Sequence, residues 1–391
     1  MSLIRVLHAS DLHIAVPEQR RSYLDACKDA VFALPSLNAK AIWKALRRMS
    51  IASSYDARIL EHLAEFIVNN SKGVKPGVEQ YDKETASKHE IVFLDDKLDA
   101  IVLSGDLATT GLEGDLRRVN GFLTAEYDPD APHRPKDLMR MIGTLFALDL
   151  RTTKVACLPG NHDRYWFHWK VPTYMPGDRL FDAAVANYWV EPVQTTSITS
   201  KSGDLKVVII AADFSLRRIS DCEGPFGWIA QGRVYNDSDN DVLGQLVSKT
   251  RGERANSVNS DQVCILWALH FPPEFPGQSE QHKLIGEEKL LAQADPLGVN
   301  GILAGHTHYQ LKYREASPNK SPVFCCGTTT QFEPKSSVLE TGAKGRRGNL
   351  FQILTITNSA TGQIHIERDE YYHPPTLTSV PRTQTHWRKI T

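Results

Sequence analysis

The stretch TTKVACLPGNHD, residues 152–163, sets a short apolar run directly before a group of polar side chains. Residues 153–158 predict a buried strand, because a short apolar run that ends at Pro and Gly is typical of one. Asn161, His162 and Asp163 follow at once. Ligands gather at the carboxyl ends of strands in α/β proteins, so this order predicts a site at a sheet edge.

The same order, an apolar run closed by polar side chains, occurs at four other places. The five motifs together supply carboxylates, an amide and imidazoles, which are side chains of metal-binding type. They are spread over most of the 391 residues, which predicts one continuous catalytic domain. The other four motifs are Asp11-Leu12-His13, Gly105-Asp106, Leu269-His270 and Gly305-His306-Thr307-His308.

The periodicity of the chain predicts an α/β fold with helices outside a central pair of sheets. Strands alternate with helices early in the chain, and mostly strands follow late. Helical patterns cover residues 37–49, 56–69, 113–126 and 135–148. Strand patterns cover residues 4–10, 98–103, 153–158, 205–211, 263–269, 299–304, 323–326, 351–357 and 363–368. We expect a single domain over residues 1–391, with a largely helical insertion at about 14–90 and a β-rich C-terminal extension at about 331–391.

Spacing within two motifs lets paired side chains reach one ion. Residues i and i+2 at a strand end point to the same side, which pairs Asp11 with His13 and His306 with His308. A glycine just before a ligand permits a turn or a close approach that a side chain would obstruct. Asp106 can bridge two metals, because a carboxylate has two oxygens and the charge to offset two cations.

The mixed ligand set favours two divalent ions of the Mn, Fe or Zn kind over Ca or Mg. Asp11 and Asp106, when ionised, leave the two ions with residual positive charge that favours an anionic phosphate. Two ions about 3.5–4 Å apart can lower the pKa of a bridging water and clamp the attacking and leaving oxygens. This set predicts two-metal activation of water for attack on a phosphate ester.

Two histidines are set apart from the ligands. His162 is expected to protonate the departing alkoxide, with its pKa set by neighbours such as Asp163. Protonation matters because an alkoxide is a poor leaving group. His8 falls on the other side of its strand from Asp11, so a structural role is expected.

The five motifs together resemble those of the calcineurin-like metallophosphoesterase superfamily, and in detail its bacterial cyclic-nucleotide phosphodiesterase branch. The likeness covers about residues 4–330, with all motifs in family order. It implies a four-layer α/β/β/α sandwich with two central mixed sheets. The matching stretches are residues 10–14, 104–108, 159–163, 269–273 and 304–308.

The resemblance also implies a division of the ligands between two metals, with His162 facing the substrate. Phe271 stands where the family often has a second histidine, and the segment 14–88 is longer than the branch usually has. The implied ligands are Asp11, His13, Asp106 and His308 for one metal, and Asp106, Asn161, His270 and His306 for the other.

Composition favours a cytoplasmic protein that acts on neither membranes nor nucleic acid. The formal net charge is -1, which gives no electrostatic case for either. No run approaches the roughly 18 apolar residues of a spanning helix, and residues 1–6 lack the apolar segment of a secretory signal. Cys157 and Cys264 lie in strand-like runs, and the adjacent Cys325 and Cys326 are poorly placed for a disulfide, which suits a reducing compartment.

The predicted function is hydrolysis of a small phosphodiester, with a cyclic nucleotide as the first choice. A DNA nuclease of the repair-exonuclease kind and a non-catalytic scaffold that keeps the fold remain alternatives. The aromatic stretch 165–188 fits a nucleobase wall or a packed helix, and Arg164 fits a phosphate contact or a surface salt bridge. A homodimer stays open, and the segment 14–88 fits a lid, a dimer contact or a simple elaboration.

Overall fold

The computed structural model of the chain describes its central sheets and the helices packed on them. The predicted helices at 37–49 and 135–148 lie outside the described residues, as does most of the segment 14–88. The described residues are 2–14, 57–72, 97–109, 111, 113–124, 153–164, 177–190, 192–215, 231–235, 241–256, 262–276, 284–314, 319–330, 337–338, 349–359, 362–373 and 387–389.

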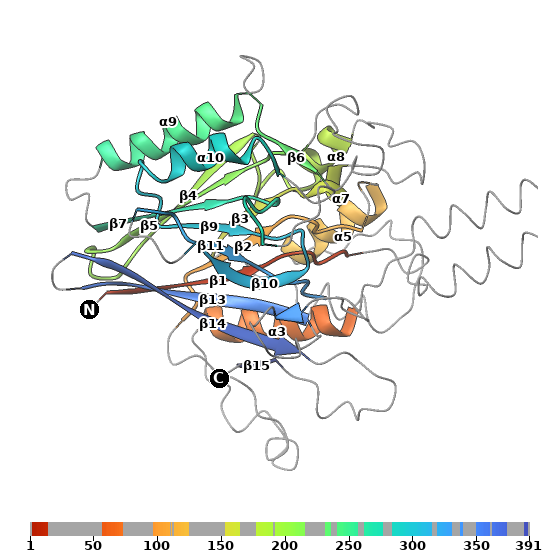
Figure 1. Cartoon of the computed structure of the whole chain (residues 1–391). Coiled ribbons are helices and arrows are strands. Elements are labelled where there is room, and N and C mark those ends of the chain that lie inside the picture. Colours follow the sequence, from red (N-terminus) through yellow and green to blue (C-terminus); the bar gives the residue numbers. More distant parts are fainter. Residues whose placement is uncertain are drawn as a thin grey trace, which may run out of the picture.

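The first sheet has six strands in its described part, in the order β15-β14-β13-β1-β2-β3 (Figure 1). β1, β2 and β3 run parallel, whereas β13, β14 and β15 each pair antiparallel with a neighbour. The C-terminal strand β13 lies beside β1 in the middle of this mixed sheet. The strands are β1 (Leu3–Ala9), β2 (Ala100–Ser104), β3 (Lys154–Leu158), β13 (Asn349–Asn358), β14 (Ile364–His373) and β15 (Arg388–Lys389).

The second sheet has seven strands in its described part, in the order β12-β10-β11-β9-β7-β5-β4. Its centre, from β11 to β5, is parallel, and β4 and β10 pair antiparallel with their neighbours β5 and β11. A small ladder joins β6 (Gly232–Arg233) to β8 (Leu284–Ile285). The seven strands are β4 (Val193–Thr199), β5 (Lys206–Ala212), β7 (Val263–Ala268), β9 (Gly301–Ala304), β10 (Tyr309–Tyr313), β11 (Val323–Cys325) and β12 (Ser337–Val338).

Helices cover the outer faces of the two sheets, and alternation along the strands explains why. Val207 and Ile209 of β5 belong to the core that contains the first sheet, whereas Val208 and Ile210 belong to the core under α9 and α10. On the opposite face α3 lies beside β13 and β14 (Figure 1). Its Phe66 ring packs against the Phe351 ring of β13. The expected four-layer arrangement with two mixed sheets is confirmed. The helices are α3 (Ala57–Lys72), α5 (Glu113–Thr124), α7 (Asn161–Arg164), α8 (Gly177–Ala184), α9 (Val242–Ala255) and α10 (Glu287–Ala294).

The nine predicted strands and the helices at 56–69 and 113–126 are confirmed, with shifts at their ends. The expectation of mostly strands late in the chain is confirmed in the described part, although α9 and α10 were not predicted there. α9 buries Val242, Leu243 and Leu246 at helical spacing, although its two glycines and its Ser and Thr lower helix propensity. Packing on the sheet therefore stabilises a helix whose local sequence is weak.

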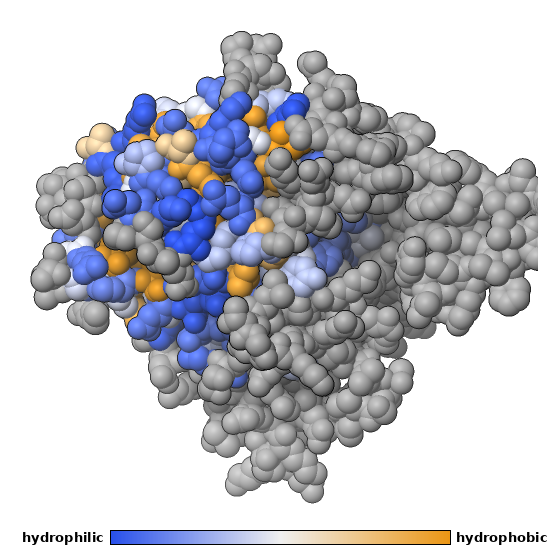
Figure 2. All heavy atoms as spheres, viewed as in Figure 1, coloured by the Kyte–Doolittle hydropathy of each residue, from blue (hydrophilic) through white to orange (hydrophobic). Residues whose placement is uncertain are grey.

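The outer surface over α9 and α10 interleaves hydrophilic and hydrophobic residues (Figure 2). Large apolar side chains that are exposed in the described part include Leu180, Val190 and Tyr309. Single exposed apolar residues of this kind are normal on a globular protein. Among the helices that the structure describes, none has the length and apolar character needed to span a bilayer.

Candidate metal centre

The register of the parallel strands brings the five motifs to one edge of the two sheets. In the first sheet Ala9 of β1 pairs with Leu103 of β2, so the residues that follow both strands emerge side by side. In the second sheet Ala268 of β7 pairs with Leu303 of β9 in the same way. Because carboxyl ends of parallel strands share an edge, ligands far apart in sequence converge there.

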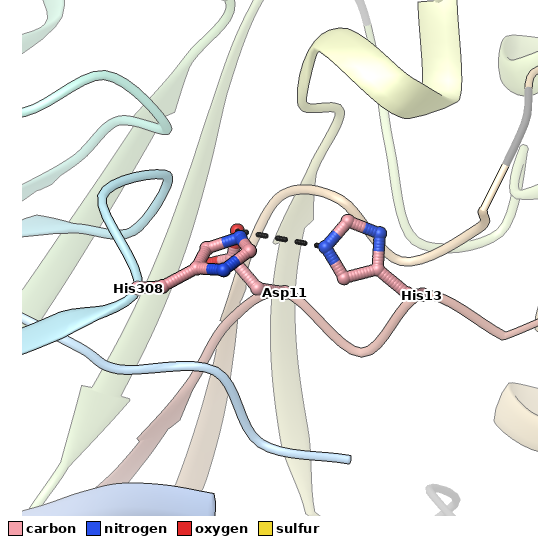
Figure 3. A group of neighbouring side chains, drawn as sticks. All are labelled: Asp11, His13 and His308. Atoms are coloured by element: carbon pink, nitrogen blue, oxygen red, sulfur yellow. Dashed lines mark ion pairs between the residues drawn. The ribbon is translucent and has the colours of Figure 1, made fainter. Parts of the chain in front are cut away.

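One cluster consists of Asp11, His13 and His308. Oδ1 of Asp11 lies 3.3 Å from Nε2 of His308 and 4.0 Å from Nε2 of His13. Figure 3 shows the three side chains together, two from the loop after β1 and one from the loop after β9. The Asp11 side chain is buried, whereas that of His308 is 28% exposed, so this cluster is the more accessible one.

A second cluster surrounds Nε2 of His270. This atom lies 3.1 Å from Oδ1 of Asn161, 3.2 Å from Nδ1 of His306 and 3.4 Å from Oδ2 of Asp106. Nδ1 of His270 donates to the Ser104 carbonyl at 2.8 Å, which leaves Nε2 to face the cluster. Four ligand-type atoms therefore meet in one small buried volume.

Asp106 joins the two clusters. On one side its carboxylate forms a group with His270 and His306, and on the other side it forms a group with His13 and His162. Within each group the ligand atoms lie within 4.8 Å of one another. The motif resemblance likewise places Asp106 between the two metals. The roles of the individual residues as metal ligands remain predictions.

The ligand-bearing loops have a left-handed backbone, which non-glycine residues rarely adopt. We expected Asp11 and His13 to share a side as residues of a strand end, but β1 has already ended before them. The left-handed turns aim the two side chains instead. Backbone strain of this kind is typical of functional sites. The φ angles are 54° at Asp11, 49° at His13, 51° at Asp106, 68° at His306 and 59° at His308.

Two motif glycines are required by close packing in the centre. A Cβ at Gly105, whose φ is 96°, would overlap the His270 ring. A Cβ at Gly160 would overlap the Asp106 carboxylate. Both positions exclude a side chain so that the ligands of neighbouring strands can approach one another.

Burial and the neighbouring charges shift the pKa values of several side chains in the centre. Burial alone would raise the pKa of Asp11, but His308 and His270 lower it to about 2. Burial alone would lower the pKa of His270, but Asp106 and Asp11 raise it to about 9. Burial, followed by His162 and His308, lowers the pKa of His13 to about 3, which keeps that imidazole neutral. The carboxylates thus hold a proton on His270, and a cation would compete for the same place.

The residues present fit divalent cations. The buried Oδ1 of Asp11 receives no hydrogen bond from the described residues, although it faces the imidazoles of His13 and His308. The donor set combines imidazole nitrogens with carboxylate and amide oxygens, which suits borderline first-row ions. A buried acceptor of this kind is costly unless a cation or a donor satisfies it.

His162 lies beside both clusters and is half-buried. Its ring meets the His13 ring edge-on with 4.7 Å between centroids, and its backbone N–H donates to Oδ1 of Asp106 at 2.8 Å. Nδ1 lies 2.9 Å from the Thr109 carbonyl, which can only accept, so this nitrogen carries a proton.

The expected support of His162 by Asp163 is not what the structure describes. The Asp163 carboxylate accepts hydrogen bonds from the backbone N–H groups of Leu107, Ala108 and Gly160. Burial and the Asp106 charge raise its pKa to about 7 in spite of these bonds. Asp163 therefore ties the second motif to the third, and the Thr109 carbonyl holds the His162 ring.

Arg164 forms the salt bridge that was one of its two expected roles, but the ion pair is buried and does not lie at the surface. Its guanidinium is buried, with Nη2 2.8 Å from Asp213 and Nη1 3.2 Å from Asp182. The Phe181 ring packs under it at 5.4 Å and belongs to the core. Residues 165–176 of the aromatic stretch lie outside the described part, and the described Phe181 is a packing residue.

Several supporting residues escaped sequence reasoning. The Ser104 and Thr109 carbonyls orient His270 and His162, and both residues flank the Gly105-Asp106 motif. Phe271 packs against the rings of His270 and His306, at 4.9 and 4.8 Å between centroids, so it fills space behind the ligands. Two features of the sequence could have identified such supporting residues: their nearness to a motif, and the run of three threonines after β11.

His8 has the structural role that its position predicts. It is buried on β1, where the Gln352 amide donates to Nδ1 and Nε2 lies 2.8 Å from the Ser104 hydroxyl. Burial lowers its pKa to about 3, so the ring is neutral and joins β1 to β2 and β13. Cys157, Cys264, Cys325 and Cys326 are buried free thiols, as expected.

Structural comparison finds several distant likenesses. One is GAP50, the anchor in the inner membrane complex of Plasmodium. It is 12% identical over 100% of this chain and 90% of that chain, with a TM-score of 0.41. A predicted phosphoesterase from Streptococcus pneumoniae is 12% identical over 100% and 99%, with a TM-score of 0.29. A double mutant of Vps29 from Entamoeba histolytica is 10% identical over 99% and 98%, with a TM-score of 0.30.

A family model described as calcineurin-like phosphoesterase matches residues 4–310. The search of curated proteins found no significant match. The family match covers most of the chain and includes all five motifs, whose side chains converge in the structure in overlapping groups. The chain therefore belongs to the calcineurin-like phosphoesterase family.

Proposed function

We propose that this chain is a metal-dependent hydrolase of a small phosphodiester, with a cyclic nucleotide as the first substrate to test. One observation carries the proposal. Seven residues of metal-binding type converge from five strand ends into two neighbouring clusters, and Asp106 lies between them with His162 nearby. The Leu107-Ala108 and Pro272-Pro273 contexts of the motifs support the diester over the monoester.

Two divalent ions of the Mn, Fe or Zn kind, when bound, would supply the positive charge that attracts the phosphate and lowers the pKa of a water molecule. The residues of the chain would hold these ions in place. Asp11, His13 and His308 would hold one ion, and Asn161, His270 and His306 the other, with Asp106 shared between them.

His162 is the proton donor in this proposal. The Thr109 carbonyl fixes Nδ1, and the Asp106 carboxylate fixes the backbone N–H of His162, so the ring is held from two sides. In this proposal Nε2, the other ring nitrogen, gives a proton to the departing oxygen. Without that proton the leaving group would have to depart as an alkoxide, and this step would be slow because an alkoxide is a poor leaving group.

The test is hydrolysis of an aryl phosphodiester and of the matching aryl monoester by the Mn-loaded full-length chain, followed by a panel of cyclic nucleotides. We expect preference for the diester. A clear preference for the monoester would overturn the diester assignment. Strong, salt-sensitive cleavage of DNA would favour a nuclease instead, because phosphate contacts make DNA binding depend on salt.

A further inference from the structure

The Asp11 loop, residues 10–14, carries two of the proposed ligands on an unfavourable backbone. Asp11 and His13 both have a left-handed φ. The N–H of Asp11 donates to the Gly105 carbonyl at 3.0 Å, and the N–H of His13 donates to the Asp106 carbonyl at 2.9 Å. These bonds fix the amide side of the loop, so its carbonyl groups need partners of their own.

Threonine hydroxyls bond to four successive carbonyl oxygens, those of residues 10–13. Three of these threonines are consecutive, follow β11 and are fully buried, and the fourth is Thr109. Hydrogen bonds to every carbonyl along this stretch stabilise one loop conformation against the alternatives. The pairs are Thr329 with Ser10, Thr328 with Asp11, Thr330 with Leu12 and Thr109 with His13.

The three consecutive threonines are themselves fixed to the middle of the first sheet. The Leu350 N–H of β13 donates to the Thr328 carbonyl at 2.9 Å, and the Thr329 hydroxyl lies 3.0 Å from the Leu350 carbonyl. Ser10 and Thr328 form a parallel bridge. The Asp11 loop is therefore clamped between the second motif and β13.

We propose that Thr328, Thr329 and Thr330 are positioning residues for the Asp11 side of the metal centre. They hold the left-handed loop that aims Asp11 and His13, whereas His270 on the other side is oriented by the Ser104 carbonyl. The proposal rests on the two-metal function proposed for this site. Loss of a hydroxyl then weakens binding of one ion and spares the other.

The experiment compares Thr328→Val, which removes the hydroxyl and keeps the shape, with Thr328→Ser, which keeps the hydroxyl. Calorimetric titration with Mn gives the two dissociation constants of each full-length protein. We expect Thr328→Val to weaken one of them by about 10- to 100-fold, while Thr328→Ser binds both ions as the wild type does. Thr330→Val is the second variant, and it replaces Thr328→Val if that protein does not fold.

Hydrogen exchange of the metal-free proteins tests the same clamp without an ion. We expect the amides of Asp11, His13 and Ile14 to exchange faster in Thr328→Val than in Thr328→Ser. Equal exchange in this segment, or equal weakening of both ions, would overturn the proposal. A wild type that binds two Mn ions and hydrolyses no phosphoester would instead refute the proposed function and leave the clamp standing.

Discussion

The two halves of the candidate centre are positioned by different means. Asp11 and His13 are aimed by a strained loop whose carbonyls are held by threonine hydroxyls, and their partner His308 is 28% exposed. His270 is 1% exposed, oriented by a carbonyl and packed against Phe271. Substitutions should therefore act on one half at a time, except at the carboxylate that both halves share.

The shared carboxylate gives the largest expected effect. Asp106→Asn removes the negative charge between both clusters, so binding of both ions weakens and hydrolysis falls by about 100-fold or more. Activity and metal content of the purified variant check this. Asp369→Asn on β14 is the matched control, since Asp369 pairs with Lys389 far from the centre. Unchanged metal content in Asp106→Asn would contradict the bridging role.

His162→Ala should separate chemistry from metal binding. We expect the turnover number to fall by about 10²–10⁴-fold, because the leaving group loses its proton donor. Both ions should stay bound, which elemental analysis of the same sample checks. If His162→Ala and Asp106→Asn both leave hydrolysis unchanged, the chemistry is not carried here and the chain fits a scaffold.

Two ligand variants test directly whether the two halves of the centre bind their ions independently. His308→Ala should weaken the ion on the exposed side, and His270→Ala the ion on the buried side, each while the other ion stays bound. The weakening should reach about 10- to 100-fold in one dissociation constant. Loss of both ions in either variant would show that the halves are not independent.

A substitution in the packing behind the buried half of the centre should have the smallest effect. Phe271→Leu keeps an apolar side chain but loses ring contacts with His270 and His306, which should cost about 1–2 kcal/mol of unfolding free energy. The control is Phe122→Leu in α5, which is equally buried outside the centre. Both should lower the melting temperature, and only Phe271→Leu should also weaken Mn binding.

Much of the fold could be predicted from the sequence because its strands are short, apolar and buried on both faces. The runs that became β5, β7 and β9 are of this kind, and their polar successors marked the edge where the site lies. α9 was missed because packing on the sheet, and not its local sequence, stabilises it. Helix propensity is a weak guide where tertiary contacts decide.

The candidate ligands could be predicted because each lies in a motif, but their supports could not. A threonine such as Thr329 looks like any other polar residue until the register of β13 and β1 places its hydroxyl against Ser10. Asp163 was assigned to His162 because the two are adjacent, whereas the carboxylate turns to the backbone of the second motif. Sequence adjacency does not fix side-chain direction.

The most direct test is electron paramagnetic resonance of the full-length protein titrated with Mn. Two ions bridged by Asp106 would lie close enough to couple, so we predict two bound ions per chain and the multiline spectrum of a coupled pair. Asp106→Asn should show the simple six-line signal of isolated ions or no bound Mn. A wild-type protein that binds one ion per chain, or two uncoupled ions, would contradict the shared centre.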